Sequence, residues 1–228
     1  MSTFEAPVLL TVRGTLAPTT LEAARVVHNE TAGSERGIQA ARSLGDLSHN
    51  VYSPSLRSKQ SGAKAGELLF LDTWESPVGL QEFFSNPAVH EQASKLFTAK
   101  DATVWMPARA SSSYQLPAPS AKHERFVGVI RGAIKSPESA LATFASVDRK
   151  TMRDARRRGQ ISHQLYIKLA APGDASPLEI LGVDVWHSFE GMTEHYSDQT
   201  HMSELGAVFA APPQASVWEV APGTWSEW

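Results

Sequence analysis

The chain has 228 residues, which fits one large domain or two small ones and can form a hydrophobic core without disulfides or metal ions. Its formal net charge of −3 gives no basic field to attract nucleic acid or acidic lipid, and the lack of cysteine excludes disulfides, thiol catalysis and thiolate metal sites. The first residues lack the pattern of a secretion signal, and no apolar run reaches the roughly 20 residues that cross a bilayer. We therefore expect a soluble, cytoplasmic protein with no nucleic-acid or membrane partner.

The predicted elements occur in the same order in both halves of the chain. Short β-branched runs ended by glycine predict strands, and stretches rich in Ala, Leu, Glu and Arg predict helices. In the first half we expect strands at 8–12, 47–52 and 68–74, helices at 21–44 and 77–97, the second of them broken at Asn86-Pro87, and a closing strand from 104. In the second half we expect strands at 126–130, 161–169 and 179–186, helices at 138–158 and 189–209, and a closing strand from 217.

Four sequence blocks recur in the same order, at offsets of 112 to 118 residues. VLLTVRG matches FVGVIRG, GDLSHNVY matches GQISHQLY, LLFLDTW matches ILGVDVW, and ATVW matches ASVW. A self-similarity of this length indicates a duplicated domain. We predict one domain at 1–108, a linker at 109–123 containing SSS and PAP, and a second domain at 124–228.

The order strand, helix, strand, strand, helix, strand is that of a ferredoxin-like α+β domain. In this fold, helices cover one face of a four-stranded antiparallel sheet and leave the other face in need of a partner. The third strands, LLFLDTW and LGVDVW, are apolar on both faces, which indicates burial on both sides. We therefore expect two tandem ferredoxin-like domains packed sheet to sheet, as a single-chain dimeric α/β barrel. Association beyond this pseudo-dimer is left open.

The repeated G-x-[LI]-S-H-x-x-Y and D-x-W motifs, with the helix and V-W strand that follow, resemble the antibiotic biosynthesis monooxygenase-like domains of the dimeric α/β-barrel group. The resemblance covers both halves except the linker and the tail after 221. It implies oxidation of a small aromatic, phenolic or quinol-type molecule by dioxygen, without a metal or other cofactor. It also implies a dry pocket between sheet and helices, with a base and a hydrogen-bond donor for the substrate's oxyanion.

The second copy is the half that we expect to be more active. His163 is the candidate base or proton shuttle, and Asp184 is the candidate residue that orients it. Tyr166 and Arg131 are candidate donors to a substrate oxyanion. The proposed pocket wall consists of Trp186 and Tyr196.

The first copy carries an equivalent set, except that an aromatic ring without a hydroxyl replaces the tyrosine of the pocket wall. The candidate catalytic residues are His49, Tyr52 and Asp72, and the candidate substrate-binding residues are Arg13, Trp74 and Phe84. Each residue also has a structural interpretation: a neutral core histidine, an interface tyrosine, a paired carboxylate or a core tryptophan.

The same residues allow other functions to be considered against the sequence pattern. A polar cluster from His187 to His201 in the second copy has few counterparts in the first and no H-E-x-x-H pattern, so we expect no metal site. Haem degradation would use Trp186 and His195, but neither first strand contains the asparagine of the haem-degrading members. The main alternative to an oxygenase is therefore a non-catalytic small-molecule-binding or structural protein of the same fold.

Overall fold

The computed structural model describes residues 7–59, 61–108, 112–117, 124–170, 173 and 175–228. These residues form two compact units, which we describe separately. The N-terminal unit contains the chain up to Pro54, Lys64–Met106 and Val220–Trp228, and the C-terminal unit contains Ser55–Ala63 and Pro107–Glu219. The two units are therefore not contiguous in sequence. The limits 1–108 and 124–228 stay a prediction for the repeats themselves.

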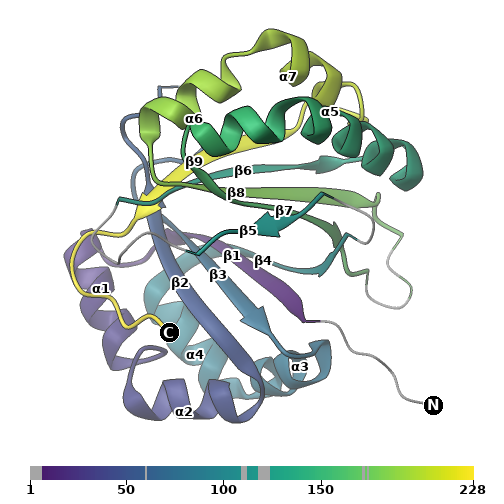
Figure 1. The fold of residues 1–228 in the computed structure, drawn as a ribbon. Coiled ribbons are helices and arrows are strands. Elements are labelled where there is room, and N and C mark those ends of the chain that lie inside the picture. Colours follow the sequence, from purple (N-terminus) through teal and green to yellow (C-terminus); the bar gives the residue numbers. More distant parts are fainter. Residues whose placement is uncertain (1–6, 60, 109–111, 118–123, 171–172, 174) are drawn as a thin grey trace. The chain divides into compact units, whose positions relative to one another are not determined.

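The N-terminal unit is a four-stranded antiparallel sheet with helices on one face (Figure 1). The strand order is β4-β1-β3-β2. Its elements are β1 (Val8–Leu16), α1 (Leu21–Glu30), α2 (Glu35–Ser43), β2 (Asp46–Pro54), β3 (Glu67–Trp74), α3 (Pro77–Ser85), α4 (Pro87–Leu96) and β4 (Phe97–Pro107).

The C-terminal unit repeats this arrangement, with strand order β9-β6-β8-β7 and a short fifth strand, β5, beside β7. Helices α5, α6 and α7 cover one face of its sheet (Figure 1). Its elements are β5 (Tyr114–Gln115), β6 (Phe126–Ala133), α5 (Pro137–Arg157), β7 (Gln160–Lys168), β8 (Glu179–Trp186), α6 (Phe189–Tyr196), α7 (Gln199–Gly206) and β9 (Gln214–Val220). The expected α+β repeat of strand, helix, strand, strand, helix, strand is thus present twice.

The expected helix at 21–44 is two helices, because the chain turns at Thr31–Ser34. Ser34 caps the second helix, since its side chain accepts a hydrogen bond from the backbone N–H of Gly37. The corresponding helix of the second repeat, α5, is continuous over 21 residues. Of the expected linker, 109–111 and 118–123 lie outside the described residues, whereas Tyr114–Gln115 form β5.

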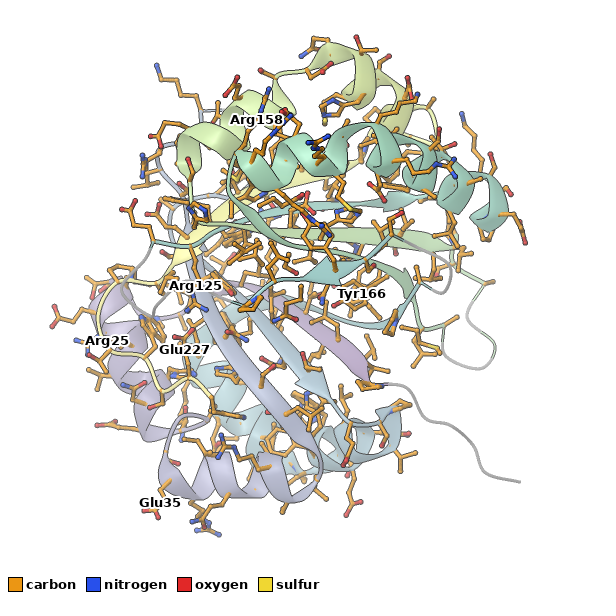
Figure 2. All side chains as sticks on the ribbon, viewed as in Figure 1. Arg25, Glu35, Arg125, Arg158, Tyr166 and Glu227 are labelled. Carbon is orange, nitrogen blue, oxygen red and sulfur yellow. The ribbon has the colours of Figure 1, made fainter. Side chains whose placement is uncertain are left out.

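The C-terminal tail belongs to the N-terminal unit, and the repeat pattern did not predict this. The backbone of Trp228 exchanges two hydrogen bonds with the backbone of His49 on β2, at 2.7 and 3.2 Å. Glu227 accepts a hydrogen bond from the backbone N–H of Val51, and Figure 2 shows it beside β2. The tail also buries Trp225 in the core of this unit. Among the described residues, no helix is both long and apolar enough to span a membrane.

Candidate functional site

A cavity of about 560 Å³ lies in the C-terminal unit, between the sheet and helices α5, α6 and α7. This volume is within the range of small-molecule sites. One face of α5 lines it with residues three, four, seven and eight positions apart, as expected of a helix packed against a pocket. The lining residues include Gly128, Ile130, Phe144, Val147, Asp148, Thr151, Met152, His163, Leu165, Gly182, Asp184, Met192, His195, Tyr196, His201, Met202 and Leu205.

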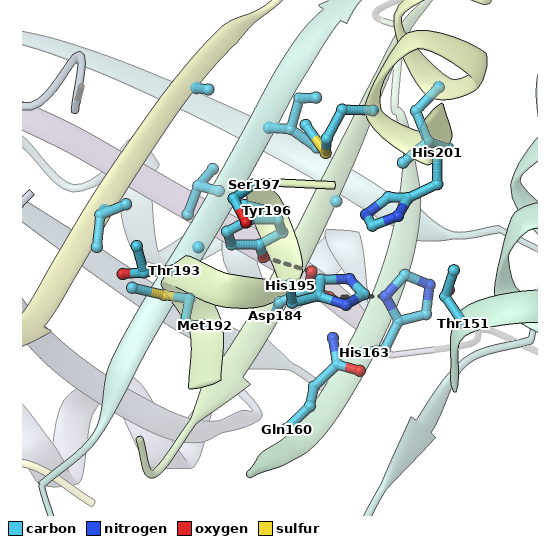
Figure 3. Close-up of a pocket in the computed structure, with 18 of the residues that line it drawn as sticks. Thr151, Gln160, His163, Asp184, Met192, Thr193, His195, Tyr196, Ser197 and His201 are labelled. Atoms are coloured by element: carbon cyan, nitrogen blue, oxygen red, sulfur yellow. Dashed lines mark hydrogen bonds and ion pairs between the residues drawn. The ribbon is translucent and has the colours of Figure 1, made fainter. Parts of the chain in front are cut away.

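A hydrogen-bonded chain of three side chains crosses the cavity wall (Figure 3). His163 on β7 and Asp184 on β8 are directly opposite each other in the antiparallel register. Nδ1 of His163 donates to Oδ1 of Asp184 at 2.6 Å, and the hydroxyl of Tyr196 donates to Oδ2 of the same carboxylate at 2.6 Å. The carboxylate therefore fixes both the imidazole and the phenol.

The same histidine also faces a second carboxylate, Asp148 of α5. Its Nε2 lies 3.4 Å from Oδ2 of Asp148, and neither atom has a hydrogen bond. Burial by itself lowers the pKa of His163, but the two carboxylates outweigh burial and raise the pKa to about 10. The imidazole is thus protonated at neutral pH. This charge state disfavours the expected role of His163 as a base.

His195 has the opposite electrostatic character. It lines the cavity from α6, and burial lowers its pKa to about 4, so the ring is uncharged at neutral pH. Its ring lies 4.8 Å from that of His201 and 5.2 Å from that of Trp186, measured between centroids. A neutral imidazole has one nitrogen lone pair and can accept a proton.

A glycine makes the contact between Tyr196 and Asp184 possible. Gly128 on β6 lies opposite Asp184, and a Cβ atom at this glycine would come within 2.4 Å of the Tyr196 hydroxyl oxygen. Burial and the adjacent Asp184 carboxylate raise the pKa of Tyr196 well above its usual value, so its phenol stays neutral. In the first repeat, Leu10 occupies the position opposite Asp72.

The N-terminal unit keeps the histidine–carboxylate pair but fills the space around it. Nδ1 of His49 lies 2.7 Å from Oδ1 of Asp72. Phe70 occupies the position that Gly182 has in the second repeat, and its ring lies 4.9 Å from the ring of His49. The tail adds a Trp228 ring stacked on His49 at 4.7 Å. The large side chains at these positions explain why this pair is enclosed in a packed core.

The remaining partner of His49 is another histidine. Nε2 of His28 on α1 lies 2.9 Å from Nε2 of His49. Burial and the neighbouring His49 lower the pKa of His28 to about 4. The pKa of His49 is raised, because the nearby carboxylates, Asp72 foremost, outweigh the opposing effect of burial. The Nε2 atom of the strand histidine thus faces His28 in the first repeat and Asp148 in the second.

Three residues of the expected second-copy site lie away from the cavity. Tyr166 is three residues after His163 on the strand, so its side chain points to the other sheet face, where it bonds to Gln164 (Figure 2). Arg131 forms an ion pair with Glu179 at 2.7 Å. Trp186 is fully buried in the core beneath α6 and does not line the cavity.

The other expected first-copy residues also have structural partners. Tyr52 is buried. Arg13 forms an ion pair with Glu67 at 2.8 Å, the counterpart of the arginine pair in the second repeat. The rings of Trp74 and Phe84 pack together at 6.3 Å.

The sequence analysis assigned no functional role to Asp148. His195 and His201 entered it only as possible metal ligands, and His195 also as a possible haem ligand. The helical spacing of the lining face of α5 was the signal that could have found Asp148. Across the described part of the chain, no group of three His, Asp or Glu side chains is arranged to hold a metal ion.

The comparisons with known proteins show the fold. No family model and no curated relative matches the chain. An anthrone oxidase-like protein is similar in structure with a TM-score of 0.65 at 13% identity, over 96% of this chain and 93% of that one. A candidate monooxygenase of Lactobacillus acidophilus has a TM-score of 0.60 at 11% identity, over 95% and 93%.

A chlorite dismutase of Candidatus Nitrospira defluvii has a TM-score of 0.51 at 11% identity, over 96% of this chain and 92% of that one. Structural similarity at sequence identities this low shows a shared fold and does not show a shared activity. The chain therefore has the α+β fold of the dimeric α/β-barrel group, with two ferredoxin-like repeats in one polypeptide.

Proposed function

We propose that the C-terminal cavity binds a small, planar phenol-, quinol- or anthrone-type molecule and catalyses its oxidation by dioxygen without a cofactor. One observation carries this proposal: an apolar cavity of small-molecule size has a neutral imidazole, His195, and a cationic imidazole, His163, on its wall. The fold likeness to an anthrone oxidase-like protein and to a candidate monooxygenase supports it.

In the proposed reaction, His195 takes the acidic proton of the substrate. Its uncharged ring can accept a proton, and the imidazolium that forms is stabilised by the substrate anion beside it in a cavity lined mainly by apolar groups. His163 cannot act as this base, because it already carries a proton at neutral pH. Its proton is instead held between the carboxylates of Asp184 and Asp148.

Asp184 and Tyr196 position His163. Asp184 holds Nδ1, and the Tyr196 hydroxyl holds the second oxygen of that carboxylate. Because the phenol of Tyr196 stays neutral, it keeps donating this hydrogen bond across the working pH range. Removing it would release one side of the carboxylate without removing charge.

For an anthrone-type substrate, the balance is that a CH2 group and O2 become a C=O group and water. His195 removes one C–H proton, and the carbanion passes an electron to dioxygen. The two radicals then join through a new C–O bond, and the peroxide takes back the proton. Loss of the second C–H proton breaks the O–O bond, forms the ketone and releases water.

The second candidate function is ligand binding without turnover. An observation in the N-terminal unit supports it. That unit retains the histidine–carboxylate pair of His49 and Asp72 inside a packed core. A His–Asp pair in this fold can therefore be purely structural. The pair alone does not distinguish an enzyme from a binding protein.

Oxygen uptake with a panel of hydroquinones and anthrones tests the proposal. We expect His195→Gln to lower kcat by about 100-fold, the typical contribution of a general base. His90→Gln is the matched control, since His90 is an exposed histidine of α4 that bonds to the carbonyl of Phe84 outside the cavity. Equal uptake by wild type and His195→Gln would refute the assigned base. Binding of the panel without oxygen uptake would support the binding-protein alternative.

A further inference from the structure

The wall of the C-terminal cavity carries more negative than positive charge around His163. The carboxylates of Asp148 and Asp184 flank a single imidazolium, at 3.4 and 2.6 Å. The three side chains are only 10%, 15% and 12% exposed, so water screens them poorly. One carboxylate charge is therefore left without a counter-charge at this end of the cavity.

The other charged groups along the cavity do not cancel this excess. Arg57 is exposed and pairs with Glu190 at 2.8 Å and with Glu124 at 3.5 Å. His201 lies 3.3 Å from a carboxylate of its own, that of Asp198. Lys59 lines the cavity from an exposed position, where solvent screens its charge.

The second carboxylate is not needed to hold the histidine–carboxylate pair. In the N-terminal unit, His28 takes the place of Asp148, and the pair of His49 and Asp72 is retained at 2.7 Å. Asp148 thus distinguishes the histidine beside the cavity, His163, from its counterpart His49, which is surrounded by Phe70 and Trp228. The charge of Asp148 is nearly buried and lies beside the cavity, where water screens it poorly.

We propose that Asp148 determines specificity: it directs the uncharged, hydroxyl-bearing end of an aromatic ligand towards His163 and excludes anionic ligands from this end of the cavity. A neutral hydroxyl group meets no like charge beside Asp148, whereas a ligand carboxylate meets like charge in a poorly screened site. The inference rests on the proposed function only in taking the ligand to be a small aromatic molecule. It does not require that the ligand react.

Binding in nitrogen-saturated buffer tests this without turnover. The probes are 1-naphthol, 1-naphthoate and the cation 1-naphthylmethylammonium, titrated by calorimetry against the full chain. For wild type we expect 1-naphthol to bind at least tenfold more tightly than 1-naphthoate. In Asp148→Asn, which keeps the shape and removes the charge, this ratio should fall to threefold or less because the anion gains affinity.

The matched control is Asp154→Asn, on the same helix. Asp154 is 42% exposed and pairs with Arg157 and Arg158 outside the cavity, so its removal changes the net charge equally. It should leave the wild-type ratio unchanged. Asp148→His, which introduces the residue type of the first repeat, provides a second variant if Asp148→Asn does not fold.

The outcomes separate this inference from the proposed function. An unchanged ratio in both Asp148 variants, or 1-naphthoate binding to wild type as tightly as 1-naphthol, would overturn the specificity role. Failure of all three probes to bind wild type would overturn both proposals. The expected discrimination, found in a protein that consumes no oxygen with any phenol, would uphold the role of Asp148 and refute the oxygenase reaction alone.

Discussion

Gly128→Ala should break the contact that ties Tyr196 to the cavity wall. The new Cβ would lie 2.4 Å from the hydroxyl oxygen of Tyr196 and 3.0 to 3.1 Å from its ring carbons, so the phenol must move. The movement removes the 2.6 Å hydrogen bond to Asp184. A hydrogen bond to a charged group contributes about 1.5–3 kcal/mol, and the Gly→Ala change returns about 0.4–1 kcal/mol through the unfolded chain. We expect a net loss of about 1–2 kcal/mol in the free energy of unfolding.

A double-mutant cycle in denaturant isolates this contact. Tyr196→Phe removes the oxygen that clashes, so Gly128→Ala should cost well under 1 kcal/mol in that background, with a coupling energy of about 1 kcal/mol or more. The first repeat also combines a side chain at the glycine position with a ring that lacks the hydroxyl: Leu10 corresponds to Gly128, and Phe84 corresponds to Tyr196. If Gly128→Ala were as stable as wild type, or equally destabilising with and without the Tyr196 hydroxyl, the role given to this glycine would be wrong.

Three further predictions concern the cavity, the C-terminal tail and the charge of His163. Gly182→Phe, which copies Phe70 of the first repeat, should fill the cavity and reduce 1-naphthol affinity at least tenfold in calorimetry, with the circular dichroism spectrum unchanged. Trp225→Ala should destabilise the N-terminal unit by about 3 kcal/mol in urea, because a buried ring that packs 5.2 Å from His28 is lost, and should leave 1-naphthol affinity intact. Since the folded pKa of His163 is raised to about 10, its stabilisation is complete below about pH 6.5 and is lost as pH rises through 10. Urea midpoints should therefore fall more steeply from pH 7 to 10 in wild type than in His163→Gln, and parallel slopes would contradict this.

The fold could be predicted from the sequence because its signals are local and occur twice. Apolar runs ended by glycine mark the strands, and Asn86-Pro87 marks the break between α3 and α4. The destination of the tail could not be predicted in this way. A strand-like segment such as 225–228 can pair with any open sheet edge. Besides pairing with β2, the tail packs closely on the turn between α1 and α2, since a Cβ at Gly33 would come within 2.6 Å of Ser226.

The site was predicted in part, for a related reason. Cross-strand register pairs His163 with Asp184 and His49 with Asp72, and the repeated motifs contain both pairs. Strand alternation also separates Tyr166 from the cavity, although the motif contains it. Charge state, however, depends on groups from distant parts of the chain. No local pattern indicates that an α5 carboxylate would keep the histidine protonated.

The differences between the repeats carry more functional information than their similarities. Where the copies agree, as in the histidine–carboxylate pair, the shared residue meets a requirement of the fold in both units. Where they differ, a small residue replaces a large one, Gly182 for Phe70, or a carboxylate replaces an imidazole, Asp148 for His28. The first substitution creates space and the second creates charge, and both occur around the same histidine. Within the described residues, the histidine that is both open to a cavity and beside a second carboxylate lies in the C-terminal unit, and we expect one ligand per chain to saturate this cavity in calorimetry.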